Sequence, residues 1–111
     1  MAAAATVPAR RGRLRIADRV YAGLARQAVR EALAEIWAER GLRGAAPKAR
    51  VLVVGGKARI TLHLEFPYPA DLAALSHTCR DAVAVQIARL TGTPVSEVAL
   101  QVEKLVTGGA Q

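Results

Sequence analysis

Two histidines and one cysteine are the residues of this chain best suited to proton transfer or nucleophilic chemistry. His63 has Thr61 and Glu65 two residues to either side, so all three side chains share one face of an extended strand. His63 and Glu65 could then titrate together and act as an acid–base pair. The pattern places no nucleophile or apolar pocket beside them, which favours a surface histidine.

Cys79 and His77 are two residues apart in a segment of helical periodicity, so their side chains point in nearly opposite directions. Cys79 falls within an apolar stripe, which favours a buried and unreactive thiol. The sequence contains no Ser/His/Asp set, paired carboxylates, H-E-x-x-H motif or P-loop. We therefore predict a protein that is not an enzyme, with no catalytic residue, cofactor, metal site or evident small-molecule substrate.

Two glycine motifs could suggest binding. Gly41-Leu42-Arg43-Gly44 matches the G-x-x-G loop with which KH domains clamp a nucleic-acid backbone. A KH loop joins two helices, whereas Ala45-Ala46-Pro47 leads into a predicted strand, so a helix cap and loop is favoured. Gly55-Gly56 is explained by a two-residue turn, because both positions need a positive φ.

The chain is strongly basic, with 16 Lys and Arg against 9 Asp and Glu and a net charge of +7. Residues 1–59 hold 13 of the basic residues and 4 of the acidic ones. Such asymmetry suggests contact with nucleic acid, anionic lipid or an acidic partner, although a compositional bias toward arginine explains it equally well. The candidate anionic-contact residues are Arg10, Arg11, Arg13 and Arg15, with Arg19 beside them.

Hydrophobic periodicity predicts a single domain over residues 13–106, between a flexible basic arm at 1–12 and a flexible tail at 107–111. Residues 13–16 alternate between polar and apolar and predict a short edge strand. A helix is expected from Asp18 to Arg40, with Asp18 as its N-terminal cap and Gly41 as its C-terminal cap. Its apolar stripe consists of Val20, Tyr21, Leu24, Ala25, Ala28, Val29, Ala32, Leu33 and Ile36.

The clearest local signal is a β-hairpin, with strands at 51–54 and 57–66 around the two central glycines. This turn places Val53 opposite Ala58 and Val51 opposite Ile60. The core face of the longer strand then consists of Ala58, Ile60, Leu62, Leu64 and Phe66. The opposite face is half polar and lacks Phe, Tyr and Trp, which disfavours base stacking of the kind used by RRM domains. The candidate partner-interaction residues on that face are Leu52, Val54, Arg59 and His63.

Pro67-Tyr68-Pro69 is expected to end the hairpin's second strand. Asp71 then caps a second helix of about 20 residues that ends at Gly92. The apolar stripe of this helix consists of Leu72, Leu75, Cys79, Ala82, Val83, Ile87 and Leu90. A last strand follows, where Val98, Leu100 and Val102 alternate with Ala99, Gln101 and Glu103. The predicted fold class is α+β, a β-α-β-β-α-β two-layer sandwich with both helices on one face of a mainly antiparallel four-stranded sheet.

This layout resembles the bacterial alkaline shock protein family, the small envelope stress response proteins. The matching segments are Leu14-Arg15-Ile16 with Asp18 and Val20, the helix to Gly41, the glycine hairpin with RITLHLEF, the Ala82-Val83 helix to Leu90-Thr91-Gly92, and the closing VSEVALQVEKLV. The resemblance covers residues 13–106. The sequence departs from the family pattern at Pro67-Tyr68-Pro69, where the family usually has Tyr-Gly, and in its long basic arm.

The resemblance implies a cytoplasmic protein that self-associates and gathers at the inner face of the cell membrane through a separate integral-membrane anchor protein. It assigns no functional residue. We therefore expect a non-enzymatic interaction protein of the envelope stress response that acts through its half-apolar sheet face. A small nucleic-acid-binding module that contacts phosphates is the alternative, and an enzyme using His63 and Glu65 is a third option. No apolar run approaches the ~20 residues that a membrane-spanning helix needs.

Overall fold

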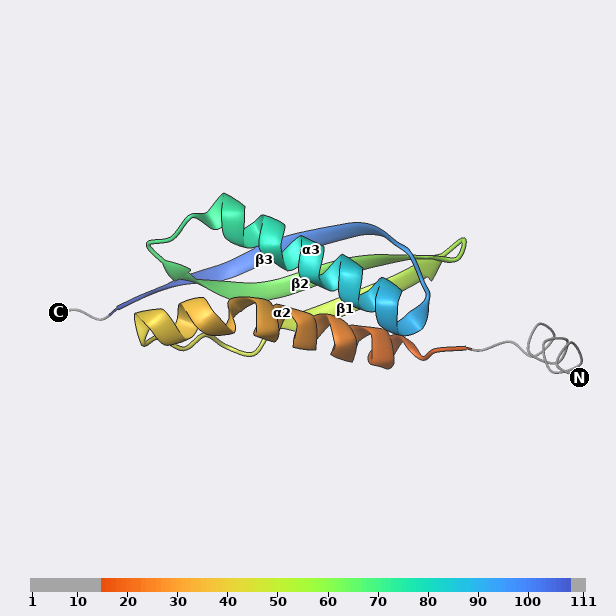
Figure 1. The fold of residues 1–111 in the computed structure, drawn as a ribbon, viewed down its shortest axis with the longest axis horizontal. Helices are drawn as coiled ribbons and strands as arrows, with labels where there is room; N and C mark the ends of the chain where they lie inside the picture. Colours follow the sequence, from red (N-terminus) through yellow and green to blue (C-terminus); the bar gives the residue numbers. More distant parts are fainter. Residues whose placement is uncertain (1–14, 109–111) are drawn as a thin grey trace, which may run out of the picture.

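The structure is a computed structural model, and it describes residues 15–108 of the 111-residue chain. Its elements follow the order α2 (Asp18–Arg40), β1 (Lys48–Val54), β2 (Lys57–Tyr68), α3 (Leu72–Thr91) and β3 (Val95–Thr107). The two helices lie side by side over one face of a three-stranded sheet (Figure 1). Within the sheet, β2 is the central strand, antiparallel to β1 and parallel to β3.

The expected four-stranded, mainly antiparallel β-α-β-β-α-β sheet is wrong. Residues 15–17 form no strand, and residues 13 and 14 lie outside the described range. Ile16 packs instead against the core as a partly buried side chain. Only Ala17 separates it from α2, and one residue spans at most ~3.6 Å, too little to carry the chain from a sheet to an overlying helix. The described part therefore has the order α-β-β-α-β, with a three-stranded open sheet.

The hairpin has the predicted register, with Val53 opposite Ala58 and Val51 opposite Ile60. Gly55 and Gly56 have φ values of 60° and 77°, the left-handed conformation that glycine adopts without strain. The second strand does not end at the expected proline, since Pro67 lies inside β2. β1 begins opposite His63, so Pro67 has a neighbouring strand on one side only, where its missing N–H is tolerated.

The core lies between the helices and the inner face of β2. Five alternate β2 side chains face it and are at most 3% exposed: Ala58, Ile60, Leu62, Leu64 and Phe66. The helices contribute Tyr21, Ala25, Ala28, Val29 and Leu33 from α2, and Cys79, Val83 and Ile87 from α3. The predicted apolar stripes are wrong only near the helix ends. Val20, in the first turn of α2, is 46% exposed, and Leu90, in the last turn of α3, is 55% exposed.

The two helices begin differently. Asp71 caps α3 as predicted, because its Oδ1 accepts a hydrogen bond from the backbone N–H of Ala74 at 3.0 Å. The N-cap of α2 is Ala17, without a side-chain hydrogen bond, so the prediction that Asp18 caps this helix is wrong. Asp18 is the first helical residue, where its negative charge still interacts favourably with the helix dipole.

We predict that Asp71→Ala lowers the free energy of unfolding by about 1 kcal/mol, because the N–H of Ala74 loses its acceptor. Asp18→Ala is the matched control and should cost only about 0.3–0.5 kcal/mol, since it removes a dipole interaction alone. Urea denaturation followed by circular dichroism measures both values. Equal losses in the two variants would contradict the difference between the two caps.

Candidate interaction surface

The face of the sheet turned away from the helices carries the predicted interaction residues. Leu52 pairs with Arg59 across the hairpin, and Val54 pairs with Lys57. Leu52 and Val54 are 56% and 54% exposed, the largest values for apolar side chains of the sheet. His63 lies farther along the same face of β2. We call this surface, formed by the outward side chains of β1, β2 and β3, the open face.

Charge is unevenly distributed across the open face. On β1, Lys48 and Arg50 precede the two apolar residues, and no acidic side chain is present on that strand. On β3, Glu97 and Glu103 outnumber the single basic residue, Lys104. The open face is therefore basic and apolar along one edge and mainly acidic along the other.

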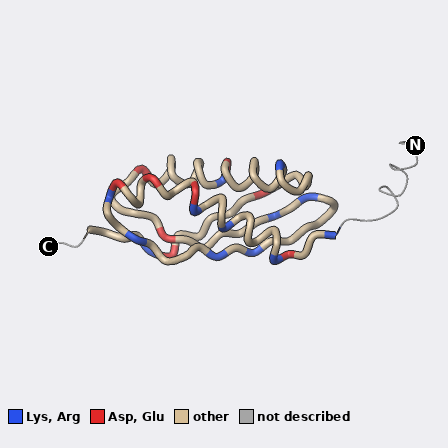
Figure 2. The backbone as a smooth tube through the Cα atoms, turned by 60° about the horizontal axis from the view of Figure 1, so that its bottom comes forward, with Lys and Arg blue, Asp and Glu red and all other residues tan. Residues whose placement is uncertain are grey.

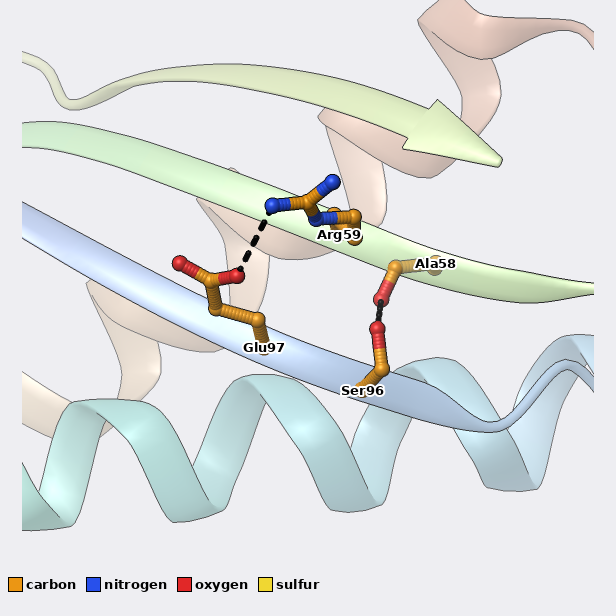
Figure 3. Close-up of polar contacts among 4 residues, drawn as sticks. All are labelled: Ala58, Arg59, Ser96 and Glu97. Atoms are coloured by element: carbon orange, nitrogen blue, oxygen red, sulfur yellow. Dashed lines mark hydrogen bonds and ion pairs between the residues drawn. The ribbon is translucent and has the colours of Figure 1, made fainter. Parts of the chain in front are cut away.

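Two irregularities in the β2–β3 pairing position the carboxylates of β3. Between residues 58 and 59, and again between 64 and 65, β3 contains one extra residue, first Ser96 and then Glu103. The Ser96 hydroxyl donates to the carbonyl oxygen of Ala58 at 3.3 Å, next to an ion pair of 3.3 Å between Arg59 and Glu97 (Figure 3). At the second irregularity, Glu103 Oε2 lies 3.0 Å from His63 Nδ1. The bulges thus bring a carboxylate to each of two predicted interaction residues.

The expected association of His63 with Glu65 is wrong. Glu65 Oε1 accepts a hydrogen bond from the backbone N–H of Ala45 at 3.0 Å and so holds the loop that follows α2. His63 contacts Glu103 instead, on a strand 40 residues away in the sequence. The geometry that an acid–base role for His63 with Glu65 requires is therefore not formed. Sequence reasoning missed Glu103 because strict alternation does not reveal where a bulge will occur.

The arginines of the predicted anionic contact are only partly described. Arg10, Arg11 and Arg13 lie outside residues 15–108, and Arg15 is exposed just before α2. Arg19 lines a hollow of about 700 Å³ together with Arg50 and Arg59, and the acidic residues Asp18 and Glu97 line the same hollow.

The basic character extends beyond that hollow. Figure 2 shows Lys and Arg spread along the described chain, while acidic residues of α2 gather toward its C-terminal end. These acidic residues are Glu31, Glu35 and Glu39. The C-terminal end of α2 is therefore acidic, and its N-terminal end borders the hollow that the three arginines line.

The helix cap explains the first glycine of the G-x-x-G motif, and packing against Trp37 explains the second. Gly41 has a φ of 63°, and its N–H donates to the Ala38 carbonyl, while the N–H of Leu42 donates to the Trp37 carbonyl. These two bonds form the Schellman cap that ends many helices. A Cβ on Gly44 would lie 2.5 Å from the Trp37 ring, so only glycine lets the loop lie directly on the indole. The structure thus has the helix cap and loop that the sequence favoured.

Cys79 is fully buried in the core, as predicted, and burial raises the pKa of its thiol to about 11 despite the opposing charge of Arg80. His77 lies on the exposed side of α3 and approaches Asp81 at 4.0 Å. Among residues 15–108, no group of three or more His, Cys, Asp or Glu side chains is arranged to hold a metal ion. Within the same range, no helix is both long enough and apolar enough to span a membrane.

Comparison with known proteins assigns no relative to this chain. No family model, curated protein or solved structure matches it. The resemblance to the alkaline shock protein family accordingly stays a prediction from the sequence pattern. The candidate surface consists of an exposed apolar pair, two carboxylates positioned by bulges and a hollow that three arginines line.

We predict that Cys79 in the folded protein reacts with a disulfide reagent near pH ~8 at least ~100-fold more slowly than in concentrated urea. The reagent reaches the thiol only after local or global unfolding, and the thiolate is the reactive form. A colorimetric thiol assay measures both rates. A rate in the native protein equal to that in urea would contradict the burial of Cys79.

The same residue links stability to pH. The thiol pKa is about 11 in the folded chain against a usual 9.0, so the folded state holds the proton more tightly. Its contribution to stability is complete below pH 9.0 and declines as the pH rises through that value toward 11. Cys79→Ala, the control, should show a shallower loss of urea resistance over this range. Identical pH profiles for the two proteins would contradict the raised pKa.

Proposed function

We propose that this chain is a non-enzymatic interaction protein whose open face binds a second copy of the same chain. The observation that carries the proposal is the exposure of Leu52 and Val54, each more than half accessible on a regular strand. Adjacent exposed apolar side chains on a rigid sheet favour burial against a partner. The surrounding polar residues would form the rim that such interfaces usually have.

The charges of the open face favour a second copy as the partner. A two-fold axis parallel to the strands, with the two sheets face to face, places β1 of each protomer over β3 of its partner. Lys48 and Arg50 on β1 then approach the strand that carries Glu97 and Glu103. The same contact forms twice, so a surface that is basic on one edge and acidic on the other complements itself.

For the role in the cell, we propose what the resemblance implies: a cytoplasmic protein of the envelope stress response, gathered at the inner face of the cell membrane by an integral-membrane anchor protein. Residues 15–17 form no strand, and residues 13 and 14 lie outside the described range, so this proposal rests on the segments from α2 onward. Self-association would help such recruitment, because several linked copies bind a membrane-bound partner more tightly than one copy does.

A nucleic-acid-binding module that contacts phosphates is the second candidate. It is favoured by the hollow that Arg19, Arg50 and Arg59 share. Against it, Arg59 is already paired with Glu97, and the outward positions of β2 from Lys57 to Glu65 include no Phe, Tyr or Trp for base stacking.

We predict that the double variant Leu52→Glu/Val54→Glu weakens self-association at least ~100-fold, because the introduced carboxylates replace the apolar contact and face the partner's β3, the strand that carries Glu97 and Glu103. Val85→Glu is the matched control: Val85 is 54% exposed but lies on α3, in the helix layer. Sedimentation velocity over a concentration series gives the dissociation constants. Circular dichroism confirms that each variant is folded.

A wild-type chain that stays monomeric at ~100 µM, or equal effects of the double variant and Val85→Glu, would contradict the proposed interface. Fluorescence anisotropy with single-stranded RNA and duplex DNA tests the alternative. Binding that falls ~10³-fold between about 50 and about 200 mM salt, and that weakens when residues 1–15 are removed, would favour phosphate contact instead.

A further inference from the structure

A second concave site lies beneath the loop of residues 41–47, against the helix-facing side of the sheet. It is a cavity of about 270 Å³ between this loop, one side of α2 and the end of β2. Its apolar walls are Val29, Leu33, Trp37, Leu42, Pro47 and Leu64. Its polar lining side chains are Arg30, Arg43 and Glu65. The open face and this cavity thus use opposite sides of β2.

Local backbone constraints hold the walls of this cavity in place. The Schellman cap at Gly41 turns the chain back so that Leu42 lies beside Trp37. Gly44 rests on the Trp37 ring, and the N–H of Ala45 is anchored to Glu65. The loop therefore needs no ligand to take up this shape, and a preformed site spares a ligand the cost of ordering it.

The volume limits what fits inside. Liquid water occupies ~30 Å³ per molecule, so about 270 Å³ corresponds to a ligand of roughly ten non-hydrogen atoms. An apolar cavity of ~150 Å³ is enough to hold benzene, and sites for drug-sized ligands begin near ~300 Å³. The cavity therefore suits one medium-length alkyl chain or one small ring.

The charges at the cavity favour an anionic head group. Arg30 and Arg43 are both exposed beside it, and within residues 15–108 the Arg43 side chain makes no hydrogen bond or ion pair. Arg30 donates to the side chain of Gln27 at 2.7 Å. Glu65 is the one acidic residue in the lining, and its Oε1 is already engaged by Ala45. Two guanidinium groups against one carboxylate leave a net positive charge, and guanidinium binds carboxylates well.

We propose that this cavity binds a medium-chain alkyl carboxylate of roughly ten non-hydrogen atoms. The alkyl chain packs against Trp37 and Leu42, and the carboxylate pairs with Arg43. This site is independent of the open face, so either proposal can fail without the other.

Octanoate is the probe, and Trp37 is the reporter because it is the only tryptophan of the chain. Titration of the full-length protein should change the indole fluorescence and shift its single indole N–H cross-peak, with a dissociation constant on the order of 0.1–1 mM. Octanol has the same chain without the charge and should bind about tenfold more weakly, since it loses a charge-assisted hydrogen bond. Octylamine should bind more weakly than either.

Arg43→Gln should weaken octanoate binding about five- to tenfold and leave octanol binding unchanged. Arg89→Gln is the matched control, an exposed arginine on α3 outside the cavity lining, and should leave both ligands unaffected. No saturable response to ~10 mM octanoate would overturn the proposal. Tighter binding of octylamine than of octanoate, or equal losses in the two variants, would overturn it as well.

Discussion

The burial of one face of β2 is the constraint on which the rest of this structure depends. Its five inward side chains are at most 3% exposed, and burying a large aliphatic or aromatic side chain contributes about 1.5–3 kcal/mol. Both helices are needed to cover that face, with α2 over β1 and α3 over β3. Within the described chain nothing remains to cover the other side of the strand. The open face is therefore a consequence of how the core is closed.

β3 adapts to this central strand through its two bulges. Between them, Val98 and Leu100 stay level with Ile60 and Leu62 and add to the core. Each bulge takes up one residue that would otherwise break the match between the apolar positions of the two strands. At the first bulge, Ser96 donates a hydrogen bond to the backbone of β2, and its neighbour Glu97 pairs with Arg59. At the second bulge, Glu103 contacts His63. Core packing and the charge pattern of the open face thus come from the same irregularities.

The sequence predicted features that depend on residues close together in the chain better than features that depend on residues far apart. The bounds of both helices, apart from the N-cap of α2, and the register of the hairpin were predicted correctly from apolar periodicity and the glycine turn, because they depend on neighbouring residues. The pairing of β2 with β3 joins segments about 40 residues apart, and no local pattern specifies its bulges. The alternation at residues 13–16 is too short to specify a strand, and the described residues 15–17 form none. The partner of His63 was unpredictable for the same non-local reason.

The cavity under the loop 41–47 has a local signal in the sequence. The sequence favoured a helix cap and loop over a phosphate clamp at Gly41 and Gly44, and Trp37 and Leu42 occupy the two positions whose side chains meet in a Schellman cap. With that cap recognised, a tryptophan beside a reversed loop predicts an apolar hollow.

The alternation of β2 then separates this hollow from the open face. Leu64 points into the cavity, whereas Arg59 and His63 point away from it. Glu65 alone serves both surfaces, because it stands on the outward row of β2 while its carboxylate anchors the loop over the cavity. Apart from that residue, the two surfaces share no side chain. A charge placed at Leu52 acts on one of them, and the loss of Arg43 acts on the other.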